Sequence, residues 1–238
     1  MQPVGIDDSR TPHQTALTPM TDSEVRRSSG RWLAAFALSV VIGHHVGTIF
    51  GSLGDLGPGA EWADWIDLLT PYAVVGSALA CLLATGADRR AWLVAAVGAL
   101  VYTQGHGIHL SANSIGNARG NAQPVHLWDE VVGHYLWYGG TYLLVAALAL
   151  ALLRDRLTST WRWPLAALFG LTMTTNGIEG GTPYFTLAVA LAFCAWGWLS
   201  RAGSGRVLLT AYGVTTVTLL GWGIYWQGFP QFSELGWI

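Results

Sequence analysis

The chain has 238 residues, of which 52% are hydrophobic and only 11% are charged, and its net charge is −2. Apolar runs of about 20 residues recur along it, which is typical of polytopic membrane proteins and argues against a soluble protein. The near-neutral charge and the lack of a basic patch with interleaved aromatic residues argue against a nucleic-acid partner. We therefore expect an all-α integral membrane bundle whose surroundings are the lipid bilayer.

The first half of the chain contains three predicted spans. Residues 1–30 are polar and are expected to form a disordered tail. The first span covers about residues 32–50, and an interfacial piece around residues 62–69 leads into the second span, which ends near Thr85. The third span covers about residues 91–114 and is followed by a loop over residues 116–124.

Four further spans are predicted at about residues 125–153, 163–178, 184–199 and 207–226. The fifth is short and turns polar from Thr172 onward, as a tilted or broken helix would. Cys81 and Cys194 lie inside apolar runs and are interpreted as small hydrophobic residues. The sequence thus predicts a membrane domain of about seven helices over residues 31–227, followed by an interfacial tail over residues 228–238.

The arginines predict an orientation, because loops on the cytoplasmic side of a membrane are enriched in basic residues. If the N-terminus is cytoplasmic, every arginine except Arg119 falls in the tail or in a cytoplasmic loop, and the C-terminus is extracytoplasmic. All basic residues are arginine and none is lysine, which is typical of GC-rich bacterial genomes. We therefore expect a multi-pass protein of a bacterial plasma membrane.

With this topology, every histidine outside the tail lies at the same depth, in the outer half of the membrane. The carboxylates Asp129, Glu130 and Glu179 reach the same level. Ionisable side chains at membrane depth are costly and normally face a bundle interior or a watery cavity, so this region is the candidate functional site. The histidines concerned are His44, His45, His106, His109, His126 and His134.

Spacing indicates how these side chains can meet. His106 and His109 are three residues apart and share one face of a helix. His126, Glu130 and His134 follow one another at intervals of four residues and form a ridge about 12 Å long. Because this ridge is too long for one ion, we expect either two metal ions or one end residue that orients a ligand.

Imidazole and carboxylate ligands without thiolate suit zinc, iron or copper and do not choose among them. His44 and His45 compete for one position, since a single membrane histidine is also a common hydrogen-bond partner between helices. The predicted metal ligands are His45, His106, His109, His126, Glu130 and His134. The predicted catalytic groups, which would transfer protons or orient a ligand, are Asp129, Glu130 and Glu179.

The sequence therefore predicts a membrane metalloenzyme with one or two metal ions, facing the extracytoplasmic side and acting on a lipid or small amphiphile. More candidate ligands are present than a closed structural site needs, which favours an open catalytic ion or a pair of ions. Among the reactions of such a site, a hydrolase is slightly favoured. A di-iron or copper oxidoreductase is one alternative, and a metal-binding transporter or a non-catalytic assembly protein is another. The aliphatic inner halves of spans one, four and six argue against a transport path. The sequence indicates no protein partner.

Overall fold

The computed structural model describes residues 22–57, 59–120, 122–152, 160–200 and 203–237. Every regular element within these residues is helical, which confirms the all-α prediction. The only strand-like feature there is an isolated bridge between Asp55 and Glu61. The expected disordered tail, residues 1–30, overlaps the first helix, which begins at Asp22, and residues 1–21 lie outside the described part of the chain.

The first half folds into α1 (Asp22–Gly43), α2 (Val46–Phe50), α3 (Trp62–Asp67), α4 (Thr70–Thr85) and α5 (Arg89–Arg119), with a 3-10 turn at Gly51–Leu53. Gly86 ends α4 in the left-handed conformation that glycine adopts readily. Asp88 then caps α5 by accepting a hydrogen bond from the Ala91 backbone N–H at 2.9 Å. The predicted interfacial piece corresponds to α3.

The expected loop over residues 116–124 is wrong in its first part, because α5 remains helical to Arg119. At 1.5 Å per residue, the 31 residues of α5 extend for about 46 Å, beyond the roughly 30 Å of a hydrocarbon layer. The apolar character of the sequence therefore ends before the helix does.

The second half folds into α6 (Gln123–His126), a π-helical segment (Leu127–Gly133), α7 (His134–Ala151), α8 (Arg162–Glu179), α9 (Pro183–Ser200) and α10 (Gly203–Trp226). The first three elements follow one another without a break and match the predicted fourth span. α8 is continuous through its polar second half, rather than broken. Gly181, with a φ of 61°, turns the chain from α8 into α9.

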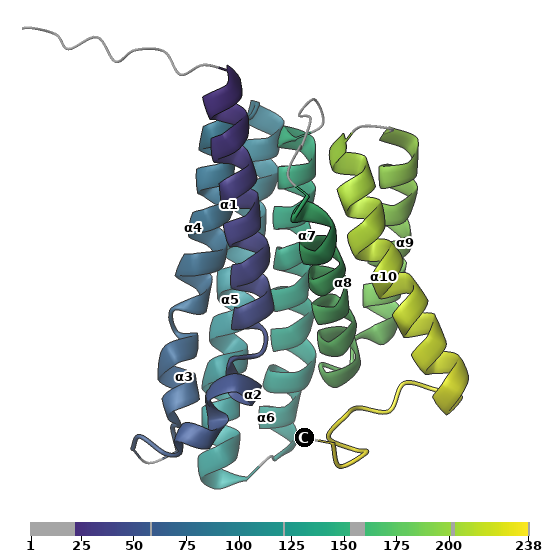
Figure 1. Ribbon diagram of the computed structural model, residues 1–238. Helices are drawn as coiled ribbons and strands as arrows, with labels where there is room; N and C mark the ends of the chain where they lie inside the picture. Colours follow the sequence, from purple (N-terminus) through teal and green to yellow (C-terminus); the bar gives the residue numbers. More distant parts are fainter. Residues whose placement is uncertain (1–21, 58, 121, 153–159, 201–202, 238) are drawn as a thin grey trace, which may run out of the picture.

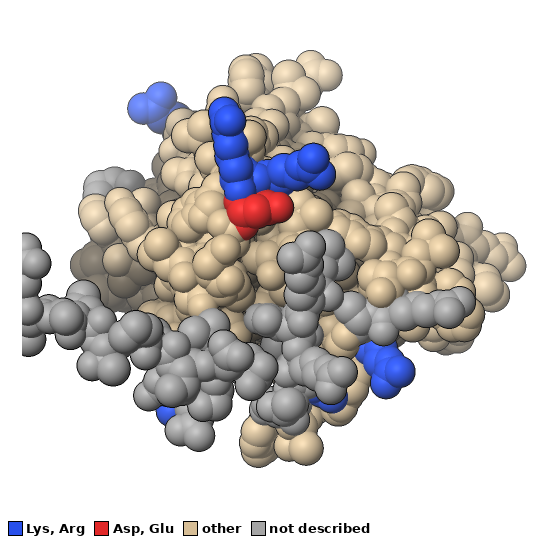
Figure 2. Space-filling view, turned by 90° about the horizontal axis from the view of Figure 1, so that it is seen from above, with Lys and Arg blue, Asp and Glu red and all other residues tan. Residues whose placement is uncertain are grey.

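The helices run alongside one another in a bundle in which α5 packs against α7 and α1 packs against α4 and α8 (Figure 1). α10 packs on both α8 and α9 and closes the other side. We call the end at which α5 and α8 begin the arginine end. Viewed onto this end, the surface shows several separate basic side chains, two of which lie beside an acidic one (Figure 2). The described arginines at this end are Arg31, Arg89, Arg90, Arg162 and Arg206.

Three described helical segments are long and apolar enough to cross a membrane, and these are Trp62–Thr85, Pro183–Ser200 and Gly203–Trp226. The segments Ser28–Gly43 and Val46–Leu53, bent by 63° relative to each other, make a fourth if they count as one span. The helices α5, α7 and α8 combine apolar turns with the polar residues of the candidate site, which lowers their hydropathy. The expected seven spans therefore stay a prediction beyond these three or four.

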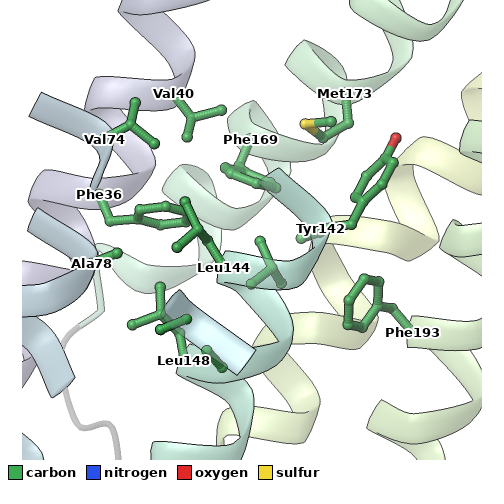
Figure 3. Packing of buried hydrophobic residues seen from close by; sticks show 14 of the residues in the cluster. Phe36, Val40, Val74, Ala78, Tyr142, Leu144, Leu148, Phe169, Met173 and Phe193 are labelled. Carbon is green, nitrogen blue, oxygen red and sulfur yellow. The ribbon is translucent and has the colours of Figure 1, made fainter. Parts of the chain in front are cut away.

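The apolar core fills the bundle between α1, α4, α7, α8 and α10 (Figure 3). Phe36 of α1 and Phe169 of α8 pack with ring centroids 6.2 Å apart, and Leu144 and Leu148 of α7 are buried beside them. Burial of such side chains supplies the main packing energy between helices in this half of the molecule. The aliphatic second half of α7 is thus explained by its central position.

Glycines bring α5 and α7 into close contact on the way to the candidate site. A Cβ atom on Gly105 would lie 2.2 Å from the backbone nitrogen of Trp137, and one on Gly140 would lie 2.3 Å from that of Tyr102. Neither helix can therefore carry a side chain at these positions without moving apart. Gly107, which also flanks His106, meets nothing within 4 Å.

Candidate metal and proton-transfer site

Three histidines lie against carboxylates in the half of the bundle opposite the arginine end. His106 Nε2 is 3.1 Å from Asp67 Oδ2, and His109 Nδ1 is 2.7 Å from Asp129 Oδ1. His134 Nδ1 is 3.4 Å from Glu130 Oε2 and 3.1 Å from the Glu130 backbone carbonyl oxygen. With His44, which is buried beside them, we call these residues the histidine layer. Its members are His44, Asp67, His106, His109, Asp129, Glu130 and His134.

Aromatic rings frame the histidine layer. The ring of Trp137 lies with its centroid 4.4 Å from that of His44, 5.0 Å from that of His109 and 5.1 Å from that of His106. Tyr138 stacks on His134 at 5.3 Å with an interplanar angle of 7°. Flat side chains on several sides restrict the rotamers of the imidazoles, which preorganises the layer.

Two of the pairs lie next to each other. The ring centroids of His109 and His134 are 4.6 Å apart, which brings Asp129 and Glu130 to the same place. His109 is on α5, whereas Asp129 and Glu130 are on the π-helical segment and His134 begins α7. The contact between α5 and α7, made possible by glycine, therefore assembles two imidazoles and two carboxylates from one helix and its neighbour.

Close approach in the histidine layer does not amount to good hydrogen bonding. Four buried atoms have no hydrogen-bond partner with suitable angles among the described residues, and these are His106 Nε2, His109 Nδ1, Asp129 Oδ1 and Glu130 Oε2. Both ring nitrogens of His44 are likewise buried without a partner there. The short distances in the pairs therefore do not make strong hydrogen bonds, because a hydrogen bond weakens steeply as its angle closes. Buried polar atoms of this kind call for an explanation such as a bound ion.

The predicted ridge of His126, Glu130 and His134 forms only in part. Glu130 and His134, four residues apart, do meet, although the stretch between His126 and His134 is π-helical. His126 is exposed, Glu130 is half-buried and His134 is buried. The ridge therefore gives way to the two pairs that His109 and His134 make with carboxylates. A π-helix is rare and is found frequently at functional sites.

Two predicted site residues make other contacts. His45 donates from Nδ1 to the Val41 carbonyl oxygen at 2.7 Å, and its Nε2 is 3.2 Å from Thr175 Oγ1 on α8. This is the hydrogen bond between helices that the sequence left open as an alternative. The Glu179 carboxylate accepts hydrogen bonds from the backbone N–H groups of Phe232 at 2.7 Å and Ser233 at 3.3 Å, so it fastens the C-terminal tail.

Sequence reasoning missed Asp67 and Trp137, and it did not choose His44 over His45. Asp67 follows Ile66 and precedes Leu68, so it is a carboxylate within an apolar stretch. That signal marks a functional candidate in a membrane segment. Its partner, His106, is far away in the sequence and is brought to it only by the packing of α3 near α5.

Within the part of the chain that the structure describes, no three His, Cys, Asp or Glu side chains are grouped closely enough to hold one metal ion as they stand. Each pair brings together two side chains of types that can bind a metal ion, and no third lies close enough among the described residues. No family model, curated protein or solved structure matches this chain. The geometry of the histidine layer therefore carries the functional argument alone.

Proposed function

We propose that the chain is an integral membrane metalloenzyme whose histidine layer binds a transition metal ion and acts on a lipid or other amphiphile. His109 and Asp129 would provide two ligands. His134 or Glu130, next to them, would provide the third. His106, paired with Asp67, would serve a second ion or orient the first site. The exposed His126 and the hydrogen-bonded His45 drop out of this ligand set.

The unpartnered buried atoms of the layer are the observation that carries the proposal. His109 Nδ1 and Asp129 Oδ1 are 2.7 Å apart and lack hydrogen-bond alignment. Ligand atoms about 2.0–2.1 Å from a tetrahedral zinc ion lie about 3.3 Å from one another, so these two atoms, 2.7 Å apart, would move apart slightly to bind one ion. An ion would satisfy groups whose burial otherwise costs about 1–3 kcal/mol each.

A bound zinc ion would lower the pKa of a water molecule toward neutrality and polarise an ester, amide or phosphate. Glu130 keeps a side chain that is 32% exposed, so it can exchange protons with water and is our choice for the proton-transfer group. The Asp129 side chain, only 8% exposed and held against His109, is better suited to orient that ring. Glu179 is engaged with the tail and would act indirectly.

An open groove of about 530 Å³ offers a route for an amphiphile. It is lined by residues of α5 that include Gly107 and Ile108, and by Val125 and Trp128. Ile108 precedes His109 and Trp128 precedes Asp129, so the groove lies on the same helical turns as part of the layer, although no residue of the layer lines it. The arginine end would be cytoplasmic, because basic residues favour that side, and the layer would then face the extracytoplasmic leaflet.

A second candidate function is supported by the pairing itself. Each of the three histidines lies against one carboxylate, and no third ligand completes a metal site among the described residues. Chains of histidines and carboxylates in membranes also carry protons. A proton-transferring network without metal would therefore use the same side chains. A redox metalloenzyme with iron or copper would likewise share the ligands of the hydrolase.

Metal analysis of the purified protein tests the proposal. Wild-type protein, extracted in mild detergent without chelator, should contain about one or two transition metal ions per chain. His109→Ala and His134→Ala should lose most of the metal, since they remove ligands from the paired cluster. His126→Ala is the matched control, because it removes an exposed histidine of the same segment and should leave the metal content unchanged.

The identity of the metal separates the reactions. Zinc would support the hydrolase, whereas iron or copper would support the oxidoreductase. Wild-type protein that contains no metal and binds none from zinc, iron or copper salts would overturn the proposal and favour the proton network. Equal metal loss in His126→Ala and His109→Ala would contradict the ligand assignment.

A further inference from the structure

A cavity of about 810 Å³ lies at the arginine end, between α1, α7, α8 and α10. Its volume is within the range of about 300–1,000 Å³ that is typical of small-molecule sites. It extends from Ser204 to Tyr212 on α10, which is two helical turns or about 12 Å. Its walls are largely apolar and include Leu33, Phe36, Leu148, Leu165, Phe169 and Val207.

Polar groups without partners point to a ligand with a polar head. Ser204 is only 5% exposed, and its hydroxyl has no hydrogen-bond partner among the residues that the structure describes. Nε and Nη1 of Arg162 are also buried and unpartnered, although its guanidinium carbon lies 4.6 Å above the ring centroid of Trp163. The hydroxyl of Tyr212 is also buried and has no hydrogen-bond partner among the described residues. All except Trp163 line the cavity, and buried polar atoms normally have partners.

The charges around the cavity are of one sign. Arg31 on α1 and Arg162 at the start of α8 both line the cavity. None of its described lining residues is acidic. A guanidinium group binds the oxygens of a phosphate with two parallel hydrogen bonds. The arrangement thus combines a cationic rim with an apolar interior.

We propose that this cavity binds an anionic phospholipid of the leaflet at the arginine end. One acyl chain would lie between α1 and α10 against Phe169. The phosphate would accept hydrogen bonds from Arg162 and Ser204, with Arg31 nearby. The site is separate from the histidine layer, which lies toward the other end of the bundle, and the inference does not depend on metal binding.

The test is native mass spectrometry of the full chain, purified in detergent and titrated with phosphatidylglycerol or with phosphatidylcholine of the same acyl chains. Wild-type protein should bind phosphatidylglycerol about tenfold more tightly, because both lipids offer the same phosphate but the choline ammonium of phosphatidylcholine would lie beside the like charges of Arg31 and Arg162. Arg162→Gln should abolish this preference. Arg90→Gln removes the same charge from the same end without lining the cavity, and it should preserve the preference.

A cavity-filling variant separates this site from the rest of the lipid-facing surface. Ala34→Phe places a ring in the cavity and should abolish binding of phosphatidylglycerol, and Ala37→Leu serves the same purpose if the first variant does not fold. Undiminished binding in a folded filling variant would overturn the proposal. So would equal losses in Arg90→Gln and Arg162→Gln, or a wild-type protein that shows no preference between the two lipids.

Discussion

The bundle contains two buried polar regions that differ in how completely their polar atoms are hydrogen-bonded. In the seam between α8 and α10, Thr215 Oγ1 donates to the Gly170 carbonyl oxygen at 2.9 Å. The hydroxyls of Thr174 and Thr218 are 2.6 Å apart, so one donates to the other, and each also lies within hydrogen-bond distance of a carbonyl oxygen of its own helix. The threonine seam is therefore a region of satisfied hydroxyls.

The histidine layer between α5 and α7 is the opposite case. Its imidazoles and carboxylates approach one another about as closely as the polar groups of the seam do, yet several of their buried atoms have no aligned partner among the described residues. Satisfied buried groups are explained by packing between helices, as threonines commonly are in membranes. Unsatisfied ones call for another explanation, such as a bound ion, an ordered water molecule or proton transfer, and this contrast directs the functional argument to the layer.

The largest expected effect concerns the close contact that assembles the layer. Gly105→Ala would place a Cβ atom 2.2 Å from the Trp137 nitrogen, so α5 and α7 must separate. We expect a loss of about 1–3 kcal/mol in the free energy of unfolding, as for other overpacked cores. Thermal unfolding in detergent, monitored by circular dichroism, measures it.

Gly107→Ala provides the control for this prediction, since it makes the same substitution on the same helix with nothing within 4 Å. It should be neutral or stabilise the helix by up to about 1 kcal/mol, because alanine is the better helix former. If both variants unfolded at the same temperature, the close contact between α5 and α7 would be contradicted.

A smaller effect of opposite sign is expected at His44. Both of its ring nitrogens are buried and unpartnered beside Trp137. In protein treated with chelator, His44→Phe should keep the stability or raise it by about 1–2 kcal/mol, because a ring of similar shape replaces an unsatisfied polar group. Thermal unfolding of the treated protein tests this, and a clear decrease would show that His44 has a partner in the folded chain.

Helix positions and the gathering of several polar residues in one half of the bundle were predictable, because they depend on local apolar runs and spacing. The prediction that His106 and His109 act together with residues near His134 rested on the same local signals. Asp67 could not be assigned to His106, because the pair depends on how α3 packs near α5. Such a contact leaves no periodic trace in the sequence.

Two features could be decided only from the backbone conformation. These are which of His44 and His45 enters the histidine layer, and whether His126 lies with Glu130 and His134. Neighbouring residues in a helix point about 100° apart, so a break at His44 and His45 decides which ring enters the layer. The π-helical segment likewise changes which side of the helix His126 occupies. Both features arise from tertiary packing, which sequence periodicity does not encode.

The smallest expected effect concerns the threonine seam between α8 and α10. Thr215→Val keeps the shape of the side chain and removes the hydrogen bond to the Gly170 carbonyl oxygen, so it should cost about 1 kcal/mol of unfolding free energy. Thr210→Val is the control, because the Thr210 hydroxyl is exposed and bonds only to the Arg206 carbonyl oxygen of its own helix. A seam that tolerated Thr215→Val as well as Thr210→Val, while His44→Phe destabilised the protein, would reverse the assignment. The threonines would then be the dispensable polar groups, and the histidine layer would be the one that holds the helices together.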